Sequence, residues 1–239
     1  MNLFNIIKND QKYWLVDQVK QDGASEEIYK EHFDHILTKW KEGNIGYLSL
    51  LMTEDYHDWL IANGLRQVSK TVEYTRDITN LPQVNSDIQW HALSEQLISD
   101  AAYGNLYERS SAGSANKNAP QKKEQFLDSL KRELGEQWRE HCFYFINDRD
   151  YAGIAIPHIE MGTMDEGRLF YFGVVPEWRG KGMGSAIHKI ALTLLRKWNA
   201  TTYVGSTGSE NEPMIRIFEQ NGCMLLEEKG MYHIESRYI

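Results

Sequence analysis

One continuous segment, residues 168–198, constrains the fold more than any other part of the chain. It reads RLFYFGVVPEWRGKGMGSAIHKIALTLLRKW. An apolar run ends before Pro176, a turn with three glycines follows, and an amphipathic pattern begins, which predicts a buried strand, a tight turn and a helix. The strand is apolar on both faces, as in a sheet that helices cover on both sides. We therefore expect an α/β protein.

The predicted helix carries one apolar stripe that would pack on the sheet. Its members recur at spacings of three and four residues: Ile187, Ile190, Ala191, Leu194, Leu195 and Trp198. The same pattern predicts a largely solvated face made of His188, Lys189, Arg196 and Lys197. The glycine turn then lies at the amino terminus of this helix.

The glycine turn is suited to an anion. Gly180, Gly182 and Gly184 remove side chains where a ligand would approach the backbone, and the first amides of a helix have no partner within it. These amides and the positive end of the helix dipole favour negative charge. Arg179 and Lys181 add formal positive charge at the rim. A diphosphate is the expected occupant.

Two other phosphate-binding motifs are excluded by spacing. The P-loop requires Ser or Thr directly after Gly-Lys. Here a glycine, Met183 and Gly184 stand between Lys181 and the next serine. The dinucleotide fingerprint requires its third glycine at the position of Ser185. A nicotinamide cofactor is therefore disfavoured.

The turn resembles the signature of the GNAT superfamily of acetyl-CoA-dependent N-acyltransferases: Gln or Arg, two variable residues, Gly, one variable residue, then Gly or Ala. Residues 179–184 match every fixed position. Residues 174–178 and 152–153 are similar to the family's Val-x-Pro-Glu-aromatic lead-in and early third-strand glycine, and residues 211–224 resemble its Asn-x-x-Ala-x-x-x-Tyr-Glu-x-x-Gly-Phe segment. The resemblance covers residues 88–238 and implies a mixed central sheet flanked by helices, splayed between the family's fourth and fifth strands.

The resemblance implies that acetyl-CoA is the co-substrate, that no metal takes part, and that a primary amine of a small molecule or peptide accepts the acetyl group. The implied cofactor-binding residues come from the strand end, the turn and the opposite strand: Phe172, Gly173, Val174, Arg179, Gly180, Lys181, Gly182, Met183, Gly184, Ser185 and Asn211. The backbone amide of Phe172 would donate to the thioester carbonyl and stabilise the developing oxyanion.

The family's catalytic acid and base are missing from their usual positions. Phe218 stands where many members have a tyrosine that protonates the CoA thiolate, and Arg168 stands where some have a glutamate. The remaining candidates are Tyr171 and Tyr232 for the acid, and Glu160, Asp165 and Glu166 for the base. A thiolate with a pKa of about 8.5 could also leave unassisted. A non-catalytic acyl-CoA sensor, and acyl transfer to a hydroxyl or thiol, stay open as alternatives.

Residues 1–81 are expected to form a smaller α/β unit before the GNAT domain at 82–239, with the boundary in the Pro- and Asn-containing stretch 81–87. The patterns predict two amphipathic helices, a strand at 46–52, a helix at 53–64 and a β-ribbon at 67–76. Residues 59–78 are similar to residues 217–239, which indicates an internal repeat. We interpret the first unit as a truncated GNAT-like half that cannot bind CoA; an unrelated helical cap is the alternative.

Two helices are expected to bracket residues 104–123, one capped by Ser94 and one with an apolar face from Phe126 to Trp138. The segment between them is rich in Ser, Ala, Asn and Gly, so it is either a solvated loop or a lid over the substrate.

Composition restricts the class of protein. The 239 residues carry a net charge of -8, which argues against a nucleic-acid binder. No apolar run approaches the roughly 20 residues of a membrane helix, and the amino terminus does not read as a signal peptide. Two cysteines without metal-type spacing fit a reducing cytoplasm. His32 and His35 share a helix face but lack a third metal ligand. A homodimer is left open.

Overall fold

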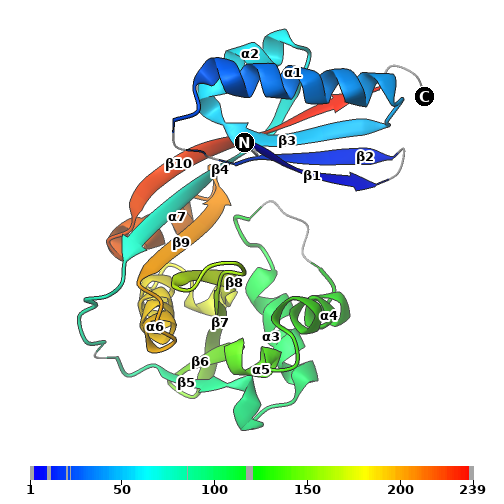
Figure 1. Ribbon diagram of the computed structural model, residues 1–239. Coiled ribbons are helices and arrows are strands. Elements are labelled where there is room, and N and C mark those ends of the chain that lie inside the picture. The colour runs from blue at the N-terminus through cyan, green and yellow to red at the C-terminus, as the bar shows by residue number, and fades with distance from the viewer. Residues whose placement is uncertain are drawn as a thin grey trace. The chain divides into compact units, whose positions relative to one another are not determined.

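The computed structural model describes residues 3–9, 12–19, 21, 23–84, 86–116 and 121–236 (Figure 1). The chain divides into two compact units, which we call unit 1 (Met1–Val72 with Glu227–Ile239) and unit 2 (Glu73–Leu226). This division differs from the boundary expected at residue 81. The reason is that two strands, β4 (Arg66–Asp77) and β10 (Met224–Glu235), each begin in one unit and end in the other.

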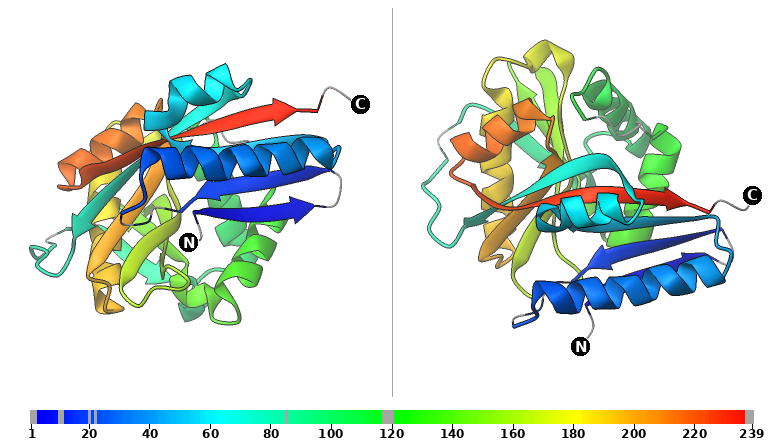
Figure 2. Two further views of the ribbon diagram at one scale, coloured as in Figure 1. Left: turned by 45° about the horizontal axis from the view of Figure 1, so that its top comes forward. Right: turned by 90° about the horizontal axis from the view of Figure 1, so that it is seen from above.

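Unit 1 is a sheet packed against helix α1 (Glu26–Glu42), with a second short helix, α2 (His57–Ala62). β1 (Phe4–Asn9) and β2 (Tyr13–Gln18) are antiparallel, β2 is parallel to β3 (Tyr47–Thr53), and β10 is antiparallel to β3. One face of α1 buries Tyr29, Phe33, Leu37 and Trp40 in the core of this unit. Figure 2 shows α1 running along these strands.

Two predictions for unit 1 are wrong. The first expected helix is instead the hairpin β1–β2, because Trp14, Val16 and Gln18 alternate with exposed residues and follow the period of a strand. The ribbon expected at residues 67–76 is the single strand β4. Its pairing partners come from the far end of the chain, so a local turn is not needed.

Unit 2 contains the expected mixed sheet with helices on both faces. Its strands lie in the order β4-β9-β8-β7-β6-β5, and β5 to β8 form an antiparallel meander. The strands are β5 (Gln89–Ala92), β6 (Phe143–Asn147), β7 (Asp150–Ile159), β8 (Glu166–Val174) and β9 (Thr202–Gly208). The helices are α3 (Asp100–Ser111), α4 (Lys123–Leu134), α5 (Trp138–His141), α6 (Met183–Lys197) and α7 (Glu212–Gln220).

The two faces of this sheet carry separate apolar cores. Tyr144, Ile154 and Ile156 pack with α3, α4 and α5, whereas Phe145 and Ala155 pack with α6. This alternation is that of strands buried on both sides. Within the described part of the chain, no helix is long and apolar enough to cross a bilayer.

The region around α3 corrects three expectations. Ser99 rather than Ser94 caps the helix, by accepting from the amide of Ala102. The segment expected to be a loop from residue 104 is helical as far as Ser111 and buries Tyr107. The helix expected from Phe126 to Trp138 is interrupted at Gly135, where φ is +71°. Residues 117–120 of the expected loop or lid lie outside the described residues.

The two similar segments of the sequence have the same local geometry. Helices α2 and α7 have Asn63 and Asn221 as their C-caps, and the next residue in each case is a glycine with positive φ, +88° and +67°. A strand of 12 residues follows in both cases, β4 in the first and β10 in the second.

Candidate active site

Strands β8 and β9 diverge within unit 2. They pair in parallel only at Glu166 with Thr202 and at Gly167 with Tyr203, although β8 continues to Val174 and β9 to Gly208. The expected splay between two neighbouring parallel strands is therefore present. Backbone groups of β8 beyond residue 167 that point toward β9 are left without a strand partner.

The ladder between β7 and β8 shows which residues point into this split. The amide of Val175 donates to the carbonyl of Ala152 at 3.0 Å, and the register then pairs Gly173 with Ile154. Because bonded and non-bonded pairs alternate in an antiparallel ladder, Gly173 directs its backbone groups toward β7. Phe172 and Val174 direct theirs toward the split. Gly173 thus cannot offer the backbone contact that the resemblance implies for it.

The turn after β8 has an open amino-terminal end. Gly180 and Gly182 have φ of +72° and +78°, and no atom lies within 4 Å of where a Cβ would stand on either. Helix α6 begins at Met183, and among the described residues its first amide to donate to a preceding carbonyl is that of Ala186, to Gly182 at 3.2 Å. With no acidic residue in the first turn, these amides retain the capacity to bind an anion.

Gly184 has a different role. A Cβ there would lie 2.7 Å from Cδ1 of Ile217, so glycine at this position allows α6 and α7 to approach each other closely. Met183 is buried in the core of α6 and contributes no side chain to the turn's surface. Lys181 is exposed, with its ammonium nitrogen 5.1 Å from the ring centre of Trp178.

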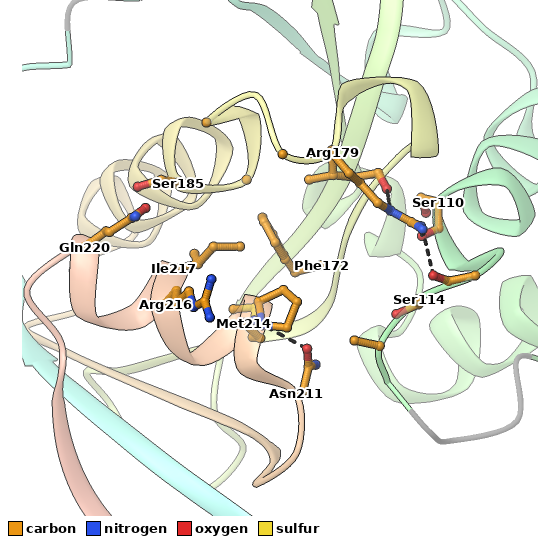
Figure 3. Close-up of a pocket in the computed structure, with 17 residues that line it drawn as sticks. Ser110, Ser114, Phe172, Arg179, Ser185, Asn211, Met214, Arg216, Ile217 and Gln220 are labelled. Carbon is orange, nitrogen blue, oxygen red and sulfur yellow. Dashed lines mark hydrogen bonds between the residues drawn. The ribbon is translucent and has the colours of Figure 1, made fainter.

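The split and the turn open into one cavity of about 580 Å³ (Figure 3). Eight of the predicted cofactor residues line it: Phe172, Val174, Arg179, Gly180, Gly182, Gly184, Ser185 and Asn211. Gly173, Lys181 and Met183 do not. Asn211 caps α7, since its Oδ1 accepts from the amide of Met214 at 3.3 Å, and its Nδ2 donates to Thr207 Oγ1 at 2.9 Å.

Two walls of the cavity lie outside the predicted cofactor-binding residues, although the first belongs to the segment considered as a lid. One is the end of α3 and the residues after it, and the other is the exposed face of α7. They contribute Ser110, Gly113, Ser114 and Ala115, and Pro213, Met214, Arg216, Ile217 and Gln220. The first wall could have been predicted from the run of small residues at 110–115, because such a run is typical of the edge of a ligand site as well as of a loop.

The two candidate hydroxyl acids lie in different places. The hydroxyl of Tyr171 is 3.3 Å from Oγ of Ser110, a cavity residue, and burial raises the pKa of Tyr171 to about 12. Tyr232 belongs to unit 1, where it is completely buried and its hydroxyl lies 3.2 Å from Glu54 Oε1. Burial raises the pKa of Tyr232 as well. Only Tyr171 adjoins a residue of the cavity.

The candidate carboxylates do not line the cavity. Nε of Arg168 lies 2.6 Å from Glu166 Oε1 and 3.5 Å from Glu160 Oε2, so the arginine at the family's base position holds both carboxylates. Asp165 accepts a hydrogen bond from the hydroxyl of Thr201 at 2.5 Å. Phe218 is also outside the lining and stacks on Tyr74 with ring centres 5.1 Å apart.

His188 is completely buried, so its predicted exposure is wrong. Its Nε2 lies 3.1 Å from the hydroxyl of Tyr203, and its ring contacts Phe172 and Phe218. Phe218 belongs to α7, a second partner of α6 that the single apolar stripe did not reveal. Burial lowers the pKa of His188 to about 3.

The buried histidine predicts a loss of stability in mild acid. Its pKa is about 3 in the folded state and about 6.5 when unfolded, so above pH 7 it is neutral in both states. As the pH falls below 6.5 the unfolded chain takes up a proton that the folded chain does not. The free energy of unfolding should therefore fall by about 2 kcal/mol between pH 7.5 and pH 5 because of this one histidine.

Denaturant titrations of the wild type and His188→Gln at both pH values measure this effect. Glutamine can still hydrogen-bond Tyr203 but does not titrate. Between the two pH values, the free energy of unfolding of the variant should therefore fall by about 2 kcal/mol less than that of the wild type. His35→Gln, on the exposed side of α1, is the control for replacing a histidine outside this core. Identical slopes for the wild type and His188→Gln would contradict the assignment.

Comparison with known proteins agrees with this geometry. Residues 113–223 match the family model described as the acetyltransferase (GNAT) family. The mycothiol acetyltransferase of Nocardiopsis dassonvillei is 25% identical over 122 residues, which are 47% of this chain and 37% of that protein. N-alpha-acetyltransferase 30 of Schizosaccharomyces pombe is 24% identical over 109 residues, 43% of this chain and 73% of that protein. The match thus spans little more than a third of the first relative.

Solved structures match nearly the whole chain in fold. A GCN5-related N-acetyltransferase from Sphaerobacter thermophilus has a TM-score of 0.71 at 14% identity, covering 97% of this chain and 76% of that one. A tandem GNAT protein from the clavulanic acid biosynthesis pathway has a TM-score of 0.62 at 13% identity, covering 97% and 78%. These likenesses show the fold, and with the family match, the split strands and the glycine turn they lead to one conclusion: unit 2 carries a domain of the GNAT superfamily, matched over residues 113–223.

Proposed function

We propose that unit 2 binds acetyl-CoA and transfers its acetyl group to a primary amine of a small molecule or peptide. One observation carries the proposal: the split between β8 and β9 and the open amides of the 180–185 turn lie in the same cavity. A CoA thioester needs both, an anion site for its pyrophosphate and an extended cleft for its pantetheine arm. Membership of the GNAT superfamily supports the same choice.

The residues present fit acetyl-CoA. The open space at the Cβ positions of Gly180 and Gly182 leaves room for a pyrophosphate against the turn. The backbone groups of Phe172 and the amide of Val174, which face the split, would bind the arm; the carbonyl of Val174 already accepts from Arg179. Bound acetyl-CoA supplies an activated acyl group, and the amide of Phe172 would donate to its carbonyl oxygen as negative charge develops there.

Proton transfer is assigned by elimination among the described residues. No carboxylate lines the cavity, so we assign removal of the amine proton to water. Tyr171 is our choice for the acid, because its hydroxyl is linked to Ser110 at the wall. A phenol with a pKa near 12 is a weak acid at neutral pH, which favours slow turnover over fast turnover.

Unit 1 is proposed not to bind CoA. Its parallel strands β2 and β3 stay paired over five positions, from Tyr13 with Tyr47 to Asp17 with Leu51, so they form no split. Ser25 caps the helix that follows β2, and Glu26 and Glu27 occupy its first turn. These carboxylates would repel a pyrophosphate. The matching geometry around Asn63 and Asn221 supports the interpretation of unit 1 as a degenerate GNAT-like half.

Calorimetry and a broad amine panel test the proposal together. We expect acetyl-CoA to bind the full chain with a dissociation constant on the order of micromolar, and a subset of amines to release free CoA, measured with a thiol reagent. Absence of acetyl-CoA binding would refute the proposal. Binding without CoA release from any amine, hydroxyl or thiol acceptor would favour the acyl-CoA sensor, which the buried Phe218 and the absence of a lining carboxylate make the second candidate.

A further inference from the structure

The guanidinium of Arg179 is committed to three backbone carbonyls. Nε donates to Val174, Nη1 to Gly113 and Nη2 to Ser110, each at 2.9 Å (Figure 3). An arginine has five N–H donors in a rigid fork, so one donor on every guanidinium nitrogen is already used. Val174 is the end of β8, whereas Ser110 and Gly113 belong to the end of α3 and the residue pair after it.

One of these carbonyls, that of Ser110, lies in the last turn of α3, where a helix needs a partner. The last carbonyls of a helix have no amide within it, and they carry the negative end of the helix dipole. α3 ends at Ser111 in a turn whose left-handed residue is Gly113, with φ of +60°. The amide of Ser114 donates to the carbonyl of Ser111 there at 3.1 Å, whereas the carbonyl of Ser110 is capped by a side chain. Arg179 supplies this cap from a distant element. Arg109, the basic residue in the last turn of α3, pairs with Glu177 at 3.3 Å instead.

We propose that Arg179 is a positioning residue: it holds the end of α3 against β8 as one wall of the acetyl-CoA cavity, and it does not bind the pyrophosphate. Ser110, Gly113, Ser114 and Ala115 form that wall. Turning the guanidinium toward a phosphate would leave the carbonyl of Ser110 at the helix end, and that of Gly113 in the turn after it, without this donor, which opposes the movement. The anion is then bound by the backbone amides of the turn. The inference rests on the proposed function, because it concerns the same cavity.

A pair of ligands separates the two roles of Arg179. Acetyl-CoA carries the phosphates, whereas acetyl-pantetheine carries the same thioester arm without any. In Arg179→Gln we expect both dissociation constants to rise by a similar factor of about ten, measured by calorimetry for acetyl-CoA and by NMR titration for acetyl-pantetheine. Hydrogen exchange of residues 108–116 should also become faster in the free protein.

Two further variants sharpen the result. Arg179→Lys keeps the charge but not the planar set of donors. It should therefore behave like Arg179→Gln if the arginine is a positioning residue. Gly182→Asp places a charge beside the pyrophosphate site and should weaken acetyl-CoA far more than acetyl-pantetheine. Circular dichroism and thermal unfolding confirm that each variant is folded.

The opposite pattern overturns the inference. If Arg179→Gln weakens acetyl-CoA alone, or if Arg179→Lys restores wild-type affinity for it, Arg179 binds phosphate. Unchanged affinities and unchanged exchange at residues 108–116 would also overturn it, since the wall would then stand without the arginine. If the wild type binds neither ligand, the proposed function fails, and the exchange measurement still tests whether Arg179 positions the end of α3.

Discussion

Gly182→Asp should weaken acetyl-CoA binding by a factor of about 100 or more. No atom lies within 4 Å of the position a Cβ would take on Gly182, so the new carboxylate would project into the space beside the open amides of α6. There it would occupy and repel the place of a pyrophosphate. Aspartate tolerates the left-handed backbone better than most residues, so the fold should persist despite φ of +78°.

Gly162→Asp is a matched control for this prediction. Gly162 also has a left-handed backbone, with φ of +88°, and nothing lies within 4 Å of its Cβ position. It does not line the cavity. Calorimetry should therefore give wild-type affinity for Gly162→Asp and a large loss for Gly182→Asp. Equal affinities in the two variants would show that the pyrophosphate does not bind at the turn, and would contradict the site assignment.

The parts of the site that the sequence predicts are those that depend on local backbone geometry. A buried strand, a glycine turn and an amphipathic helix follow one another within residues 168–198, so their order alone produces the open amides of α6. The split between β8 and β9 was expected from the family resemblance. The sequence predicts room for a ligand at Gly180 and Gly182, and in the structure both face open space; their positive φ is an additional reason for glycine that the sequence prediction did not contain.

The parts that the sequence misses depend on contacts between distant elements. Arg179 is read as a phosphate ligand until Ser110 and Gly113 are known to lie beside it. His188 is read as solvated until α7 is known to cover that side of α6. Helical periodicity identifies one buried face and assumes the opposite one is free, so a helix packed on two sides is misjudged in this way.

The division of the chain is a third case of this kind. Sequence similarity between residues 59–78 and 217–239 identified the repeat, but it could not reveal which unit each strand completes. In the structure residues 73–77 of β4 belong to unit 2, and residues 227–235 of β10 belong to unit 1. Equivalent strands are therefore exchanged between the two halves. A boundary at residue 81 would leave each half without a strand that it needs.

Because β4 and β10 each contribute residues to the unit formed mainly by the other part of the sequence, a substitution in either strand should destabilise that unit. Tyr74 on β4 is buried and stacks on Phe218 of unit 2, although it lies in the amino-terminal third of the sequence. Tyr232 on β10 lies in the core of unit 1, although it is near the carboxyl terminus. We expect Tyr74→Ala to destabilise unit 2 and Tyr232→Ala to destabilise unit 1, each by about 3–5 kcal/mol, the usual cost of removing a buried aromatic ring.

Hydrogen exchange with mass spectrometry can resolve the two effects in the intact chain. In Tyr74→Ala the protection of β7 should fall most, and in Tyr232→Ala that of β3. Tyr74→Phe and Tyr232→Phe keep the ring, so each should cost less stability than the matching alanine variant; Tyr232→Phe should still lose part of the stability because it removes the hydroxyl bonded to Glu54. Loss confined to β3 in Tyr74→Ala would show that β4 stabilises its own half, and the exchange of strands would then have to be abandoned.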